Sequence, residues 1–291
     1  MIIKNILPIS VIIPTLGGDT LNKTINNFNS CNTIVSEILI CIPKQYLSNL
    51  KIQNINNNNN NLNTIITSES GQVLQRSIGF KNSKQPFVLQ LDDDIEITIN
   101  DIENLMCHII KLDESSAIGP QYFDNFRNKF YYKSLQGWQY LESMLVDFLI
   151  GYAKLGDSRM GTISGIGKNY GFDIEKMNYN IKKVEWLAGG CVLHNRKNLI
   201  TDNYYPFTGK AYCEDIIHSI LLNKKGIKLW ICKDVICKIS DKPKILDILE
   251  SNKEQNAIEY IIKMKNGNIF LLKLNKMYWN TRNAIKNFFF K

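Results

Sequence analysis

The chain has 291 residues, of which 44% are hydrophobic, so it can bury the core of one large α/β domain with or without an appendage. The formal net charge of +8 predicts an anionic partner, and a nucleotide, a nucleic acid or an anionic membrane surface would all satisfy it. Seven dispersed cysteines without a CxxC pair indicate reduced thiols in the cytosol and argue against a disulfide scaffold or a zinc site. Without a stretch of about 18 uncharged apolar residues, no transmembrane helix is expected.

The first 112 residues alternate between buried β-strand patterns and amphipathic helix patterns. Such alternation is typical of βαβ units and a parallel sheet. A run of six asparagines at 56–61 buries too little apolar surface to offset the conformational entropy lost when a segment becomes ordered. We therefore expect a surface loop there. The predicted strands span 9–13, 37–42, 64–67 and 87–91, and the predicted helices span 19–29, 71–82 and 100–112.

The second half of the chain gives weaker signals. A strand-like stretch at 184–194 contains a break at Gly189-Gly190, which is typical of a bulge or of a close ligand approach. Residues 156–171 are rich in glycine and predict a loop. The remaining predicted elements are a short strand at 117–119, helices at 136–155, 215–225 and 245–265, and strands at 227–232 and 235–239.

Three consecutive carboxylates, Asp92-Asp93-Asp94, end the apolar strand at 87–91. A buried strand cannot enclose three adjacent charges without compensation, so the acids should emerge at its carboxyl end, where open α/β sheets bind ligands. Clustered oxygen ligands suit Mg²⁺ or Mn²⁺. An acidic turn that caps the next helix would have the same composition, so this segment alone leaves both interpretations open.

Five short motifs occur in an order that resembles glycosyltransferase family 2. They are Ser10-Val11-Ile12-Ile13-Pro14-Thr15, Gln75-Arg76-Ser77-Ile78-Gly79, Leu91-Asp92-Asp93-Asp94-Ile95, Trp186-Leu187-Ala188-Gly189-Gly190, and Glu214-Asp215 followed by Gly226. The resemblance implies an α/β fold of the GT-A type, a Rossmann-like, mostly parallel central sheet flanked by helices. The catalytic domain would span 1–240, with a nucleotide-binding half at about 1–119 and an acceptor half at about 120–240. Residues 241–291 would form a helical, basic and aromatic extension.

The resemblance also implies roles for individual residues. Asp215 would be the general base, with Glu214 orienting the acceptor or the loop. Asp94, assisted by Asp92, would hold Mn²⁺ or Mg²⁺, the divalent cation of the family. The donor nucleotide sugar would contact Pro14, Thr15, Arg76, Asp92 and Asp93, and the acceptor would contact Trp186, Gly189 and Gly190.

The chain departs from the family pattern at two places. Ile42-Pro43-Lys44 stands where many members carry an acid that meets the nucleotide base. Cys237-Lys238-Ile239-Ser240 stands where some members supply a metal-binding histidine, so the third metal ligand is unassigned. Lys238 is one candidate substitute as a positive charge, and His218 is a second candidate at that site; His108 and His194 are expected to be structural.

The expected function is that of a metal-dependent, inverting glycosyltransferase in the assembly of a bacterial-type surface polysaccharide, such as O-antigen, capsule or lipopolysaccharide. The donor would be a nucleotide sugar, with a UDP-sugar favoured, and the acceptor a glycan or a polyprenyl-linked lipid. The protein would be cytoplasmic, and its basic, aromatic tail would either contact the inner face of the membrane or pack on the catalytic domain. Alternatives are an inert glycan-binding module and a nucleic-acid-binding protein; the latter lacks a recognised motif, and no nucleic-acid partner is expected.

Overall fold

The computed structural model describes residues 5–28, 33–50, 62–67, 69–132, 136–239 and 248–289. The predicted asparagine loop at 56–61 lies outside them. Two compact units are present, and both are built from two segments of the chain. Unit 1 comprises Met1–Tyr131 and Ile174–Lys244, and unit 2 comprises Tyr132–Asp173 and Ile245–Lys291. The sequence-based division at residue 240 did not anticipate that 132–173 groups with the C-terminal segment.

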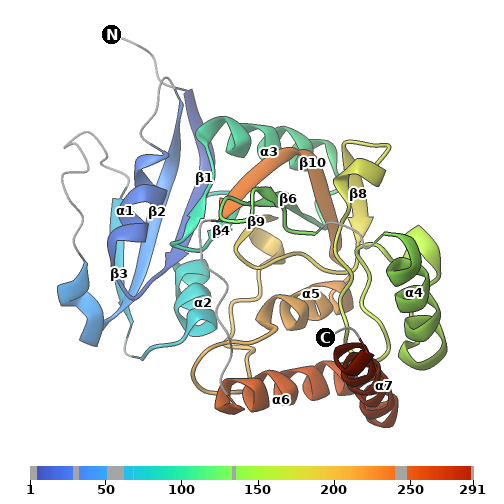
Figure 1. Cartoon of the computed structure of the whole chain (residues 1–291). Coiled ribbons are helices and arrows are strands. Elements are labelled where there is room, and N and C mark those ends of the chain that lie inside the picture. Colours follow the sequence, from blue (N-terminus) through green and yellow to red (C-terminus); the bar gives the residue numbers. More distant parts are fainter. Residues whose placement is uncertain are drawn as a thin grey trace. The chain divides into compact units, whose positions relative to one another are not determined.

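Unit 1 is built on one mixed sheet, whose ten described strands run in the order β3-β2-β1-β4-β9-β6-β10-β5, with β7 beside β6 and β8 beside β10 (Figure 1). The strands are β1 (Asn5–Pro14), β2 (Thr33–Pro43), β3 (Leu62–Thr67), β4 (Phe87–Leu91), β5 (Ile95–Glu96), β6 (Ser116–Asp124), β7 (Lys129–Phe130), β8 (Ile181–Val184), β9 (Cys191–Asn195) and β10 (Lys228–Ile239).

The sheet is more mixed than the sequence predicts. Strands β3, β2, β1 and β4 are parallel neighbours, as are β6 and β10. Strand β9 is antiparallel to both β4 and β6. The stretch predicted as one strand at 184–194 forms two, because the chain leaves β8 at Val184 and enters β9 at Cys191, at a different place in the sheet. The two strands predicted at 227–232 and 235–239 are the single strand β10.

Helices flank this sheet (Figure 1): α2 packs on β1, β2 and β3, α3 packs on β6, β9 and β10, and α5 contacts β10. Helix α3 begins with a capping box, in which Thr98 and Asp101 satisfy each other's backbone N–H groups. The helices of unit 1 are α1 (Asp19–Asn26), α2 (Gln72–Asn82), α3 (Ile99–Lys111) and α5 (Glu214–Lys224), with short 3₁₀ turns at Lys44–Asn49, Ile174–Lys176 and Arg196–Asn198.

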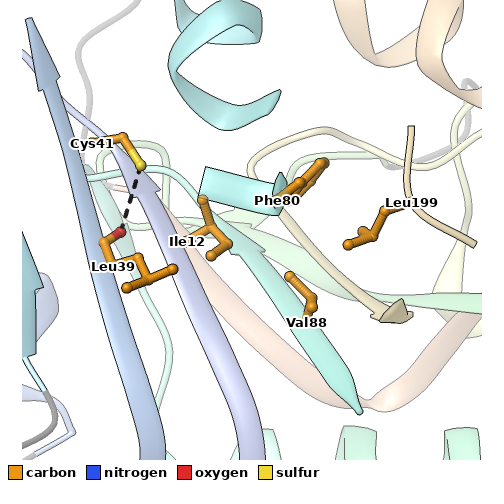
Figure 2. Packing of buried hydrophobic residues seen from close by; sticks show 6 residues of the cluster. All are labelled: Ile12, Leu39, Cys41, Phe80, Val88 and Leu199. Carbon is orange, nitrogen blue, oxygen red and sulfur yellow. Dashed lines mark hydrogen bonds between the residues drawn. The ribbon is translucent and has the colours of Figure 1, made fainter. Parts of the chain in front are cut away.

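A compact apolar cluster joins helix α2 to the strands beneath it. Figure 2 shows its members gathered between the elements: Ile12, Leu39, Cys41, Phe80, Val88 and Leu199. Gly79 makes this approach possible, since a β-carbon there would overlap the Ile12 side chain and lie 2.8 Å from Cys41 Sγ. This tight packing fixes the position of α2. It also fixes the position of the side chains that α2 directs toward the end of β4.

Unit 2 contains α4 (Gly137–Gly151), α6 (Ile248–Met264) and α7 (Ile269–Phe289), with a 3₁₀ turn at Gly156–Arg159. Its apolar cluster includes Ile166 from the first segment and Ile262 and Leu272 from the second. The turn between α6 and α7 lies directly on the backbone of Gly165, because Gly267 has no side chain to keep the two apart. None of the helices within the described ranges has the length and apolar character that crossing a bilayer requires.

Candidate active site

The acidic motif emerges at the carboxyl end of β4, as the sequence predicts. Leu89 and Leu91 are completely buried. Asp92, Asp93 and Asp94 follow them and are half-buried at the edge of the sheet that the carboxyl ends of the parallel strands form. Parallel β1 ends beside β4, so Pro14 and Thr15 reach the same edge. Antiparallel β9 begins there too, and the backbone N–H of Asp92 donates to the carbonyl of Gly190 at 2.8 Å. The topology thus gathers three of the predicted motifs.

A cavity of about 520 Å³ lies in front of these residues. Its volume is in the range of small-molecule sites in proteins. The predicted donor residues Pro14, Thr15, Asp92, Asp93 and the predicted metal ligand Asp94 all contribute to its wall; the other lining residues are Leu16, Ser70, Gly71, Gln72, Gln75, Gly209, Lys210 and Ala211.

Helix α2 supplies polar contacts that sequence reasoning did not single out. Gln72 donates to both carboxylate oxygens of Asp92 at 3.1 Å. Gln75 is buried and donates to the backbone carbonyls of Thr15 and Cys41, at 2.8 and 2.7 Å. The Thr15 hydroxyl in turn donates to Asp93. In the sequence Gln72 was only part of a helical pattern and Gln75 only part of the motif at 75–79, because the partners of both lie 20 to 60 residues away.

Arg76 is completely enclosed behind the acidic motif, with 1% of its surface exposed. Its Nη2 donates to Asp92 at 3.0 Å, and its Nη1 lies 2.9 Å from both carboxylate oxygens of Glu214. Arg76 is not among the described residues that line the cavity. In this structure Arg76 joins the end of β4 to the start of α5, and its contact with the nucleotide stays a prediction.

The charges around Arg76 do not balance. Burial alone would lower the pKa of Arg76, but the negative charges of Glu214 and Asp92 raise it well above its ordinary value. Burial also raises the pKa of Asp92, and Glu214 raises it further against the opposing effect of Arg76. One guanidinium faces two carboxylates, with Asp93 and Asp94 close by in the sequence. This surplus of negative, all-oxygen donors fits a hard divalent cation such as Mg²⁺ or Mn²⁺.

Glu214 and Asp215 form the first turn of α5, which begins one residue before the predicted helix, and their environments differ. Glu214 accepts hydrogen bonds from Arg76 and from the Tyr204 hydroxyl, the latter at 2.9 Å. Asp215 forms no ion pair within the described part of the chain, and its Oδ1 accepts from the backbone N–H of Ile216 at 2.9 Å. Burial, followed by the charge of Glu214, raises the pKa of Asp215 to about 7. Such a carboxyl group can take up or release a proton near neutral pH.

The predicted acceptor residues lie beside this turn, but they differ in accessibility. Gly189 lies against Glu214 and Asp215, and a β-carbon there would approach Asp215 Cβ to 3.3 Å. Gly190 is packed against Ile95 and the Tyr122 hydroxyl. Trp186 is completely buried, so its indole belongs to the core, and its contact with the acceptor stays a prediction. The two glycines therefore let neighbouring side chains pack closely on the backbone, and Trp186 is part of the buried core.

His218, a candidate third ligand, is buried one turn further along α5. Its ring stacks on Tyr204 with the centroids 5.1 Å apart and the planes 5° apart. Burial, together with the charge of Arg76, lowers the pKa of His218 to about 3, so the imidazole is neutral at physiological pH. Lys238 pairs with Glu96 in the register of β10 and β5. The third metal ligand stays unassigned.

Comparison with known proteins identifies the fold of the chain. No family model matches the chain, and no curated protein matches it. Among solved structures, GalNAc-T7 with UDP, GalNAc and Mn²⁺ aligns over 81% of this chain with a TM-score of 0.55 and 16% identity. The chain spans 44% of that protein's length. The GT-A-type α/β fold expected from the sequence is thereby confirmed, and membership of family 2 stays a prediction.

Two further structures align less well. S. aureus TarS, residues 1–349, matches with a TM-score of 0.48 and 13% identity, over 88% of this chain and 64% of the other. A mycobacterial protein matches with a TM-score of 0.46 and 12% identity, over 87% and 73%.

The buried position of Arg76 gives a testable consequence. Arg76→Met should lower the free energy of unfolding by about 3–5 kcal/mol, because it leaves Asp92 and Glu214 buried without their cation. Lys81→Met on the exposed side of the same helix, whose nearest carboxylate is 3.9 Å away, should cost less than about 1 kcal/mol. Urea denaturation measures both, and Glu214→Gln added to Arg76→Met should recover part of the loss. Equal effects of the two single changes would contradict the bridging role.

Proposed function

We propose that this protein is an inverting glycosyltransferase that moves one sugar from a nucleotide-diphosphate donor to a hydroxyl group of an acceptor. One observation carries the proposal: the acidic motif at the end of β4 lines a cavity together with the exit of β1, on a GT-A-type fold. The neighbour with that fold was solved with UDP, GalNAc and Mn²⁺, which supports a nucleotide-sugar donor and a divalent cation here. UDP is the favoured nucleotide.

The donor diphosphate would lie in the cavity next to the acidic motif. Asp94, with Asp92, would hold Mn²⁺ or Mg²⁺, and this cation would supply Lewis-acid stabilisation of the charge that develops on the departing diphosphate. Pro14, Thr15 and Asp93 would contact the nucleotide sugar. Lys210 is an exposed cation on the cavity wall and would add a charge suited to phosphate. Arg76 would act as a positioning residue that fixes Asp92 from behind.

Asp215 is the proposed general base. An acceptor hydroxyl becomes a good nucleophile only if a base removes its proton during attack, and a pKa near 7 is well matched to this task. The proton would pass from the acceptor oxygen to Asp215, while that oxygen bonds to the anomeric carbon and the bond to the diphosphate breaks. Glu214 would not compete for the proton, since Arg76 and Tyr204 already occupy its carboxylate. Attack from the face opposite the leaving group inverts the configuration.

The acceptor is proposed to be a glycan or a polyprenyl-linked lipid at the inner face of a membrane, in the assembly of a surface polysaccharide. Support comes from unit 2. Helix α7 carries four basic residues and no acidic one, together with exposed apolar side chains such as Phe270 and Phe288. Helix α4 exposes Trp138 and Leu149, and Tyr152, the residue that follows it, is exposed too. Within unit 2 the two helices contact each other, and Arg282 pairs with Glu142. Basic and aromatic side chains in combination suit the surface of an anionic bilayer.

Metal-dependent nucleotide binding tests the donor site. UDP with Mn²⁺ should bind to the wild-type protein, and Asp92→Asn or Asp94→Asn should weaken binding at least tenfold, because each removes a carboxylate ligand. Asp202→Asn is the matched control, since Asp202 is a surface carboxylate that does not line the cavity. Isothermal titration calorimetry, with and without EDTA, measures the change. Unaltered binding in EDTA would remove the metal from the proposal.

Turnover tests the base. Asp215→Asn should reduce transfer by about 10²–10⁴-fold while UDP–Mn²⁺ binding stays at the wild-type level. The base works only when deprotonated, so kcat/KM of the wild type should rise with pH through about 7 and then level off. A variant of full activity would refute the role of Asp215. If nucleotide sugars bind but neither transfer nor hydrolysis is detected across a panel of donors, an inert glycan-binding module is favoured instead.

Membrane contact is tested by sedimentation with vesicles. The protein should bind vesicles that contain phosphatidylserine more strongly than vesicles of phosphatidylcholine, and replacing Lys273, Lys276 and Lys286 by glutamine should weaken binding at least tenfold, at about 1 kcal/mol for each lysine. Replacing Lys23, Lys44 and Lys84 of unit 1 in the same way is the control. Equal binding to both vesicle types would contradict the proposed surface.

A further inference from the structure

A cluster of three potential metal ligands lies in unit 1 outside the cavity. His108 belongs to α3, and Cys232 and Asp234 belong to β10. The His108 Nε2 atom lies 3.0 and 3.1 Å from the two carboxylate oxygens of Asp234, and Cys232 Sγ lies 2.7 Å from Asp234 Oδ1. One donor atom from each residue falls within 4.8 Å of the other two. None of the three residues contributes to the proposed donor site.

An irregularity in β10 brings the two strand residues together. The pairing of β10 with β6 shifts between Ile231 and Ile236, where Pro120 lies opposite and offers no backbone N–H to the ladder. Cys232 and Asp234 lie inside this shift, two residues apart. His108 lies in the last turn of α3, which packs on β10. The cluster is thus set by the packing of a helix on a strand and does not depend on a long loop.

The chemistry of these donors differs from that of the acidic motif. A thiolate and an imidazole are softer ligands than carboxylates alone, and together they favour Zn²⁺ and related transition metals over Mg²⁺ or Ca²⁺. Bond lengths of about 2.0–2.3 Å in a tetrahedral zinc site place the ligand atoms roughly 3.3–3.7 Å from each other. The cluster needs adjustments of about 1 Å to reach this geometry. Cys232 is fully buried and Asp234 is largely exposed, so the fourth position would face solvent.

We propose that His108, Cys232 and Asp234 bind one zinc-class transition metal, separate from the Mn²⁺ or Mg²⁺ of the donor site. Binding forms a sulfur–metal bond and releases the thiol proton of Cys232 to solvent. The metal would join the last turn of α3 to the irregular part of β10. Without it, Cys232 keeps its proton and donates to Asp234, because burial and the neighbouring carboxylate raise the pKa of the thiol above its usual range.

Cobalt(II) provides the direct test, because a thiolate bound to Co²⁺ gives a charge-transfer absorption band in the near ultraviolet. The full-length protein should carry both Asp92→Asn and Asp94→Asn, so that the donor site takes up little metal. Titration with Co²⁺ should then produce this band and saturate at one equivalent, and addition of Zn²⁺ should abolish it. The double variant also separates this proposal from the proposed function. If the donor site turned out not to bind metal or nucleotide, the cobalt spectrum expected from His108, Cys232 and Asp234 would be the same.

Single changes identify the ligands. Cys232→Ser should remove the band, and His108→Ala should weaken Co²⁺ binding at least tenfold. Cys107→Ser is the matched control, because Cys107 is an exposed thiol next to His108 and is outside the cluster. His108 is partly exposed, so His108→Ala tests the site even if Cys232→Ser fails to fold. Absence of the band in the unmodified cluster, or its loss in Cys107→Ser with retention in Cys232→Ser, would overturn the proposal and leave a plain hydrogen-bond chain.

Discussion

The ion pairs of Arg76 connect the two halves of the candidate site. Its guanidinium binds Asp92 at the end of β4 and Glu214 at the start of α5, two positions that lie 16 and 138 residues away in the chain. A buried guanidinium is stable only when carboxylates satisfy it, so the arginine and its two partners depend on each other. Their shared geometry also fixes Asp215, the neighbour of Glu214, relative to the acidic motif. The donor motif and the proposed base are thus parts of one charged network.

This network explains why one of two adjacent acids is suited to proton transfer. Glu214 has a cation and a phenol hydroxyl as partners, and both hold its carboxylate in place. Asp215 is buried next to that charge, and burial, followed by the charge of Glu214, raises its pKa to about 7. Two carboxyl groups adjacent in sequence therefore have different chemistry, because only one of them faces the arginine.

The sequence was most informative where local pattern and site chemistry coincide. The three aspartates that follow an apolar strand could be placed outside the core, at the carboxyl end of that strand, since no core can hold those charges. The glycine pair at Gly189-Gly190 marked a place where protein side chains pack closely on the backbone, whereas the close ligand approach stays a prediction. The position of Arg76 could not be derived, because a buried and an exposed arginine on an amphipathic helix have the same sequence pattern. Trp186 raises a similar difficulty, since an aromatic residue in an apolar stretch can serve a core or a binding surface.

Long-range packing accounts for the remaining differences. A buried strand has the same apolar composition whether its neighbours are parallel or antiparallel. The position of β9 between β4 and β6 could therefore not be predicted from the sequence. The proximity of His108, Cys232 and Asp234 could not be predicted either. The three residues do not follow a short spacing motif, because one comes from a helix more than a hundred residues before the other two.

The two-segment construction of unit 2 affects the order in which the protein can fold during synthesis. Residues 132–173 leave the ribosome well before 245–291, yet Ile166 is buried only when Ile262 and Leu272 arrive. In the interval, Ile166 lacks its partners from α6 and α7, while the intervening segment can already complete the sheet of unit 1. Closing this long loop has an entropic cost that grows slowly with its length, so the delay matters more for exposure to aggregation or proteolysis than for final stability.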